Sequence, residues 1–200
     1  MVLPGRSAQL RLRGGGRPLG AQLVWPGAVP AGVMILLVDA EEAGATAHGE
    51  HVCRFISETL GVVSLNAACG GIEDGATAIE WTADHAAQLG ADGGPLLLAG
   101  LHAGAAVAAA LAVQASDTGW PDVARQVLIH ARFGGAAPWP RTGVAPATVV
   151  GGDAGTRAYA ARLRQAGVPV EELDDPDPFG EPSTQMSADG LLRHLAARLH

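Results

Sequence analysis

The feature that most constrains the fold is the run Pro95–Val113, where apolar residues surround two glycines, Gly100 and Gly104, and one histidine, His102. A short apolar run, a glycine turn and a second run of small residues are typical of a strand, a tight turn and a buried helix. The run is long enough to raise the question of a membrane span. Its opening proline, its glycines and its central histidine favour strand, turn and helix instead.

The two glycines have the spacing of a nucleophile elbow. That motif reads Gly-x-Ser-x-Gly, and it holds a serine oxygen at the apex of a strained turn between a strand and a helix. Glycine is needed on both sides because the turn packs too tightly for a side chain. In this chain the apex residue is His102. The sequence therefore predicts the turn, while the residue that the turn usually presents is absent.

The rest of the chain alternates strand and helix patterns after an opening hairpin. Continuous apolar strands are typical of a sheet that is buried on both faces. The alternation predicts an α/β fold, a doubly wound and mostly parallel sheet with an N-terminal antiparallel hairpin, in one domain over residues 1–200. The expected strands are 8–13, 19–25, 33–38, 62–65, 95–99, 126–129 and 147–150, and the expected helices are 48–60, 74–89, 104–114, 156–166 and 188–199.

Charge and composition exclude several classes of function. The net charge is −7, with 13 basic and 20 acidic residues, so a nucleic-acid partner is not expected. Every basic residue is arginine, which excludes Schiff-base chemistry and a phosphate-loop lysine. The first residues lack the apolar core of a signal peptide, and Cys53 and Cys69 show no metal-ligand spacing. We expect a cytoplasmic protein with reduced thiols, no membrane partner and no cofactor.

Four segments carry a family resemblance. Ile72–Asp92, the elbow, Gln126–His130 and Thr156–Val170 together resemble the hormone-sensitive-lipase-like branch of the α/β-hydrolases, also called α/β-hydrolase fold 3. Such enzymes are about half as long again. The segment between Arg132 and Pro146 is short here, so the resemblance implies that most of the cap is missing. The site is then open, or it is covered by a partner chain as in a homodimer.

The positions that the resemblance makes catalytic depart from the family pattern. The family's elbow reads Gly-Asp-Ser-Ala-Gly, and here Leu101 and Ala103 flank His102 at the apex. The family's His-Gly-Gly oxyanion loop falls on Asp39–Glu42, where carboxylates would repel a developing oxyanion. The family's acid corresponds to Asp153. Its late histidine has no counterpart, because that stretch offers Asp177 instead. The resemblance therefore implies a degenerate catalytic triad.

These positions give the predicted site. An imidazole at the apex next to carboxylates forms a reasonable acid/base pair. His130 ends a buried strand, and ligands of such sheets bind beyond the carboxyl ends of the strands. The predicted catalytic residues are His102, Asp153 and Asp177, and the predicted substrate-binding residues are Asp39, Glu41, Glu42, Leu101, Ala103 and His130.

Three functions remain open from the sequence. The first, which we expect, is a non-hydrolytic isomerase, lyase or cyclase that acts on a small-molecule, biosynthetic intermediate with His102 as acid/base. The second is a catalytically dead homologue that binds a small molecule or another protein. The third is an esterase with an unusual nucleophile, and a serine esterase is not expected. A space-filling histidine and a metal site built from His102 and the carboxylates are the alternatives for the apex itself.

Overall fold

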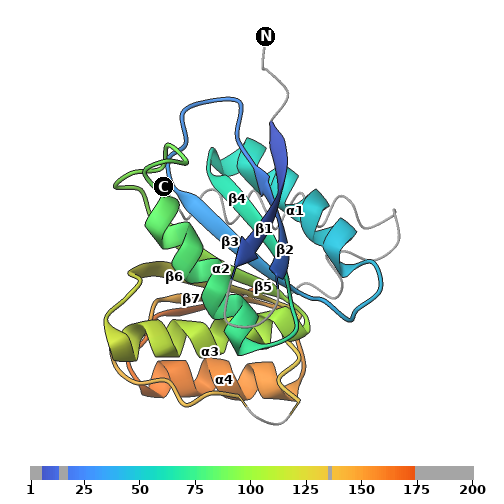
Figure 1. The fold of residues 1–200 in the computed structure, drawn as a ribbon. Helices are drawn as coiled ribbons and strands as arrows, with labels where there is room; N and C mark the ends of the chain where they lie inside the picture. The colour runs from blue at the N-terminus through green and yellow to red at the C-terminus, as the bar shows by residue number, and fades with distance from the viewer. Residues whose placement is uncertain (1–5, 14–17, 135–136, 174–200) are drawn as a thin grey trace.

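The computed structural model describes residues 6–13, 18–134 and 137–173. They form an eight-stranded sheet with helices on both faces (Figure 1). This architecture confirms the predicted α/β class with its mostly parallel sheet and N-terminal hairpin. Asp177 and the helix expected over 188–199 lie outside the described residues.

The elements follow the predicted alternation. The apolar runs did not predict one strand, β8, because its four residues, Val-Glu-Glu-Leu, place two glutamates side by side. The strands are β1 (Ser7–Arg13), β2 (Pro18–Val24), β3 (Val33–Asp39), β4 (Val63–Cys69), β5 (Leu96–Leu101), β6 (Val123–Ile129), β7 (Ala147–Val150) and β8 (Val170–Leu173). The helices are α1 (Ala45–Leu60), α2 (Ile72–His85), α3 (Ala103–Thr118) and α4 (Ala154–Gln165).

The strand order is β1-β2-β4-β3-β5-β6-β7-β8. β2 pairs antiparallel with both β1 and β4, and every later pair is parallel. All six residues of β5 are buried, and so are the first six of β3, because these central strands have helices on both sides. The parallel strands end at one edge of the sheet, and this edge carries the site.

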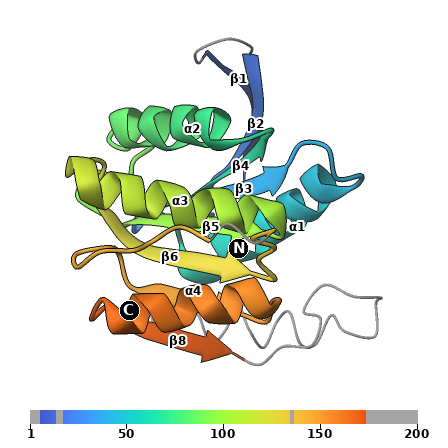
Figure 2. The ribbon, with the colours of Figure 1, turned by 90° about the horizontal axis from the view of Figure 1, so that it is seen from below.

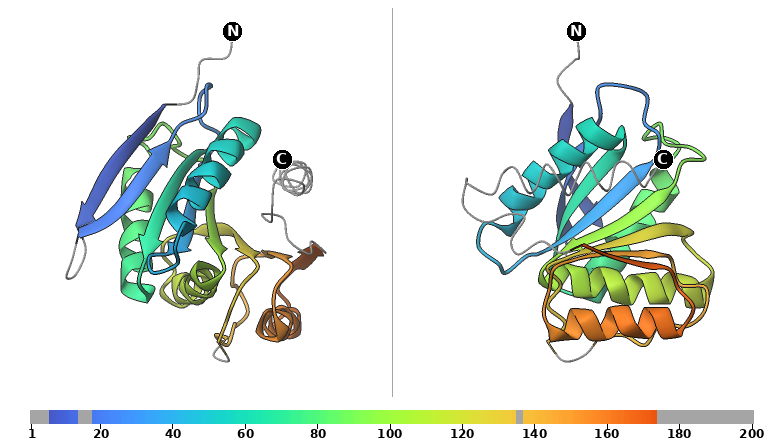
Figure 3. Two further views of the ribbon diagram at one scale, coloured as in Figure 1. Left: turned by 90° about the vertical axis from the view of Figure 1, so that its right-hand side faces the viewer. Right: turned by 180° about the vertical axis from the view of Figure 1, so that it is seen from behind.

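The helices divide between the two faces. The core on one face contains residues of α2, α3 and α4, and the core on the other contains residues of α1. Figure 2 shows α2 and α3 next to each other, and Figure 3 shows α1 on the opposite side of the sheet from α2. Helix α3 is rich in alanine, with Ala105, Ala108 and Ala109 fully buried. Small side chains let this helix lie close against the centre of the sheet.

Both cysteines are buried free thiols. Cys53 lies on α1 with no exposed surface, and Cys69 ends β4. Burial raises the pKa of the Cys53 thiol far above its usual range, and the charge of Glu50 adds to the shift. The thiolate is therefore strongly disfavoured at Cys53 in the folded protein. Within the described ranges, no helix is long and apolar enough to cross a bilayer.

The turn between β5 and α3 is the predicted elbow. His102 has φ 51° and ψ −115°, a backbone conformation that residues other than glycine rarely adopt. A Cβ added to Gly100 would lie 2.5 Å from Ala105 Cα, and one added to Gly104 would overlap the carbonyl oxygen of Leu37. The two glycines therefore let α3 start directly against β5 and β3.

We predict that Gly100→Ala and Gly104→Ala each lower the free energy of unfolding by about 2 kcal/mol or more, because the added methyl group meets backbone atoms rather than a movable side chain. Urea unfolding followed by circular dichroism measures the change. Gly20→Ala on β2 is the control, since no atom lies within 4 Å of its added Cβ. Equal stability of all three variants would contradict the close packing of the elbow.

Candidate active site

His102 stands at the carboxyl edge of the sheet, and its backbone is fixed on both sides. Its N–H donates to the carbonyl oxygen of Ile129 at 3.0 Å. Its own carbonyl oxygen accepts from the N–H groups of Ala105 at 3.2 Å and Arg132 at 3.1 Å. These bonds tie the strained residue to β6, to α3 and to the loop after β6. The surrounding structure thereby compensates the cost of the unusual conformation, about 1–3 kcal/mol.

The loop between β3 and α1 brings a carboxylate to this apex. Asp39 Oδ1 accepts from the N–H of Glu41 at 2.8 Å, and the N–H of Ala45 donates to the carbonyl oxygen of Glu42 at 3.1 Å. Gly44 has φ 81°, which allows the chain to turn into α1. Asp39 therefore shapes the loop that carries Glu42.

Glu42 and His102 form the central contact of the site. His102 Nδ1 lies 3.0 Å from Oε1 and 3.0 Å from Oε2 of Glu42, and the two side chains are 23% and 30% exposed. A carboxylate is only an acceptor, so Nδ1 carries the proton of this hydrogen bond. In the neutral imidazole, Nε2 is then the basic nitrogen. The pair is a histidine oriented by a carboxylate, the arrangement that general-base catalysis requires.

Arg132 adds a positive charge to the pair, and sequence reasoning missed it. Its Nη1 lies 3.5 Å from Glu42 Oε1, and its side chain is 61% exposed. An exposed ion pair of this kind contributes less than about 1 kcal/mol to stability. Its importance is local, because the guanidinium balances the charge of Glu42 at the apex. The signal available in the sequence was its position directly after a buried strand, near the predicted carboxylates.

His130 lies beside the apex, as its position at the end of β6 predicted. Its N–H donates to the carbonyl oxygen of Val150 at 2.8 Å, and it has φ 46°. Its ring centre is 6.4 Å from that of His102, with the planes at 71°. The sheet edge thus brings two imidazoles into an edge-to-face arrangement, the second of them on the strand next to the elbow.

A pocket of about 160 Å³ opens in front of His102. Glu41 is exposed and is not among the residues that line it, and Ala103 starts α3 next to it. His48 of α1 also lines it. The lining residues are Val38, Asp39, Glu42, Ala43, Gly44, Ala45, His48, Leu101 and His102. Three of the predicted substrate-binding residues, Asp39, Glu42 and Leu101, are therefore in the wall.

Asp153 lies at the N-terminus of α4 and caps that helix. Its Oδ1 accepts from the N–H of Thr156 at 2.9 Å, and the Thr156 hydroxyl donates to the carbonyl oxygen of Ala131 at 2.7 Å. Among the described residues, the carboxylate that reaches His102 belongs to Glu42. The structure therefore does not bring Asp153 to the imidazole. Within the same ranges, no three side chains of histidine, cysteine, aspartate or glutamate form a metal site.

Comparison with known proteins supports the architecture. Residues 66–149 match the family model of the alpha/beta hydrolase fold. Esterase LipI of Mycobacterium tuberculosis is 30% identical over 137 residues, which are 62% of this chain and 43% of that protein. The chain therefore spans less than half the length of this curated relative.

Two solved structures share the fold. An esterase of Pyrobaculum calidifontis superposes with a TM-score of 0.82 at 19% identity, covering 97% of this chain and 85% of its own. Esterase LipW of Mycobacterium marinum superposes with a TM-score of 0.81 at 20% identity, covering 98% of this chain and 82% of its own. The chain therefore has the α/β-hydrolase fold, as the sequence predicted, and its central part is similar to that family.

The same comparisons contradict the expected function. A non-hydrolytic isomerase, lyase or cyclase was expected, with a catalytically dead homologue as the alternative, and a serine esterase was not expected; the relatives are named esterases. The expectation assumed that carboxylates on the loop after β3 would repel an oxyanion. In the structure the carboxylate of Glu42 is engaged by His102 and Arg132, so its charge is balanced.

We predict that Asp153→Ala lowers stability by about 1 kcal/mol, the usual cost of losing a helix cap, and leaves the imidazole resonances of His102 unchanged. Thermal unfolding measures the first effect, and a pH titration of the ring signals by nuclear magnetic resonance measures the second. Glu42→Gln serves as the comparison, because it changes the hydrogen-bond partner of the ring. A changed pH titration curve of the His102 ring signals in Asp153→Ala would indicate that Asp153 contacts the imidazole.

Proposed function

We propose that this protein hydrolyses carboxylic esters of small molecules at the elbow, with His102 and Glu42 as the catalytic pair. The single observation that carries the proposal is the contact of His102 Nδ1 with both carboxylate oxygens of Glu42 at 3.0 Å. The similarity to Esterase LipI supports the reaction class. The elbow of this chain presents the base itself, where the family presents a serine.

The first step follows from the tautomer that Glu42 selects. The basic Nε2 of His102 accepts a proton from a water molecule while the water oxygen attacks the ester carbonyl carbon. The new C–O bond forms as the carbonyl π bond breaks, and its electron pair moves to the carbonyl oxygen. The imidazole becomes an imidazolium, and the carboxylate of Glu42 stabilises this positive charge.

The second step returns the proton. The tetrahedral intermediate re-forms its carbonyl group, the bond to the alcohol oxygen breaks, and Nε2–H of the imidazolium protonates the leaving alkoxide. The products are a carboxylic acid and an alcohol, and His102 regains its starting state. The two steps balance with one ester and one water molecule consumed.

Two features of the chain suit the negative charge of the intermediate. The first N–H groups of a helix have no partner within the helix and form its positive end, and α3 starts at Ala103 directly after the apex. Arg132 brings a guanidinium to the same carboxylate that orients His102. An oxyanion between these donors would be stabilised, as in other acyl-transfer sites.

The pocket sets the expected size of the substrate. A volume of about 160 Å³, walled by residues such as Ala43, Gly44 and Ala45, suits a short acyl group better than a long one. We further propose that the protein acts in the cytoplasm on a small-molecule ester, with no nucleic-acid or membrane partner. Its two buried free thiols support a reducing compartment.

We predict that the purified protein hydrolyses p-nitrophenyl acetate and that His102→Ala lowers kcat/KM by about 10²–10⁴, the usual contribution of a general base. Release of p-nitrophenolate measures the rate. His85→Ala is the control, because His85 stacks on Trp81 of α2 away from the elbow. Equal rates for wild type and the folded His102→Ala variant would contradict the proposal.

We also predict that Glu42→Gln lowers kcat/KM by about tenfold or more, because an amide no longer stabilises the imidazolium. Glu41→Gln is a matched control with the same change of charge one residue away, and we expect it to stay near wild type. The two variants are compared on p-nitrophenyl acetate at equal ionic strength. Equal losses in both would indicate a general charge effect rather than a specific pair.

A further inference from the structure

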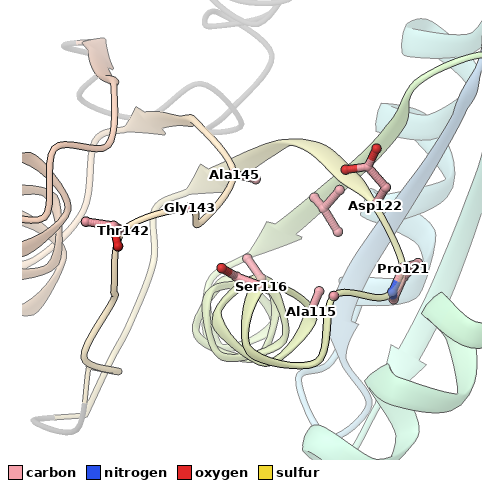
Figure 4. A pocket seen from close by; sticks show the side chains of 10 residues that line it. Ala115, Ser116, Pro121, Asp122, Thr142, Gly143 and Ala145 are labelled. Atoms are coloured by element: carbon pink, nitrogen blue, oxygen red, sulfur yellow. The ribbon is translucent and has the colours of Figure 1, made fainter.

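A second pocket lies at the opposite edge of the sheet from His102, where α3 ends and β6 and β7 begin. Its volume is about 290 Å³. Figure 4 shows Ser116 on α3 between the segment with Thr142 and Gly143 and the segment with Pro121 and Asp122. It is lined by Ala112, Ala115, Ser116, Gly119, Pro121, Asp122, Val123, Thr142, Gly143 and Ala145. None of these residues belongs to the proposed catalytic site.

The pocket exists because its walls are built of small residues. Ala112 and Ala115 form the α3 side, and both are buried. Gly143 adopts φ 95° with Ser116 Oγ 3.5 Å from the position of a Cβ, so the opposite wall also lacks a side chain there. A volume of about 290 Å³ is close to the lower end of small-molecule sites. The space suits a ligand of only a few heavy atoms.

The lining has one charge, and it is negative. Asp122 contributes a carboxylate, and none of the ten lining residues is basic. The last carbonyl groups of a helix form its negative end. In α3 the Thr118 hydroxyl donates to the carbonyl oxygens of Gln114 and Ala115, and the last turn has no basic residue. The carboxylate and the helix end therefore give the pocket a negative potential from two independent sources.

The nearby arginine does not cancel this potential. Arg141 precedes the lining residue Thr142, and its Nη1 lies 3.8 Å from Oδ1 of Asp117, which is not among the lining residues. The two side chains are 76% and 41% exposed. This ion pair is neutral as a whole and stands outside the lining. Asp122 is exposed to solvent, and it is the charged residue among the ten that line the pocket.

The polar groups of the pocket are well suited to an N–H donor. The Asp122 carboxylate and the carbonyl groups at the end of α3 only accept hydrogen bonds, and the hydroxyls of Ser116 and Thr142 can accept them. A primary ammonium group offers three donors and a positive charge, and Ala112, Ala115 and Val123 offer apolar surface for a short alkyl chain. We propose that this pocket binds a small organic ammonium ion.

The test uses butylammonium chloride as the probe, with 1-butanol and sodium butyrate as neutral and anionic probes of similar size. Amide shifts of the whole protein are followed by nuclear magnetic resonance at constant ionic strength. We expect saturable shifts at Ser116, Gly119, Asp122 and Gly143 with butylammonium alone. The measurement does not depend on ester hydrolysis, so its failure leaves the proposed esterase activity untouched.

Two variants separate a specific site from general attraction. Asp122→Asn should weaken butylammonium binding at least about tenfold, because the charge-assisted hydrogen bond is lost. Asp84→Asn, an exposed residue of α2, changes the net charge equally and should leave binding unchanged. Ala115→Leu should fill the space and abolish binding in a protein whose thermal unfolding shows that it still folds.

Three results would overturn the proposal. One is the absence of saturable shifts with butylammonium at these amides. Another is equal binding of 1-butanol, which would identify an apolar pocket without charge selectivity. The third is an equal loss in Asp122→Asn and Asp84→Asn, which would reduce the effect to net charge.

Discussion

The structure depends on one strained residue, His102, which lies where the backbone of α3 comes close to the backbones of β5 and β3. His102 takes its unusual φ and ψ because Gly100 lets α3 start against β5 and Gly104 lets it pass β3 without a side chain between them. Three backbone hydrogen bonds then fix the turn to its neighbours. The central helix, the sheet edge and the apex are consequently set by one piece of local geometry, whichever side chain stands at the apex.

The site shows how a fold can keep its geometry when its usual residues change. The loop after β3 carries carboxylates here, and the turn made by Asp39 points one of them, Glu42, toward the imidazole. The imidazole is therefore held from the loop after β3. The fold brings the side chains close together and orients them, and one fold can carry different sets of functional residues.

Much of this could be predicted from sequence, because burial leaves strong patterns. The apolar runs of β3 and β5 and the spacing of Gly100 and Gly104 predicted the central strands and the elbow. Short β8 was missed because Glu171 and Glu172 interrupt any apolar run. At the site, the sequence placed Glu42 on the right loop but could not show its contact with His102, which depends on the turn of residues 39–44.

The side-chain roles were harder to predict, since they depend on distances between loops. Arg132 reaches Glu42 from the loop after β6, and no local pattern marks a contact between residues so far apart in the chain. Asp153 matched a family position, yet its carboxylate is used locally to cap α4. Local rules explain such a cap well, whereas the pairing of loops at a sheet edge requires the three-dimensional fold.

The two cysteine thiols can report when parts of the molecule open. Cys53 on α1 and Cys69 at the end of β4 are buried in the cores on opposite faces of the sheet, and a thiol can be alkylated only when a reagent reaches it. The alkylation rate of either thiol in native buffer therefore measures how often the helices on that face of the sheet move away from the strands. The two rates, compared within one sample, would tell whether the two layers open together or one at a time.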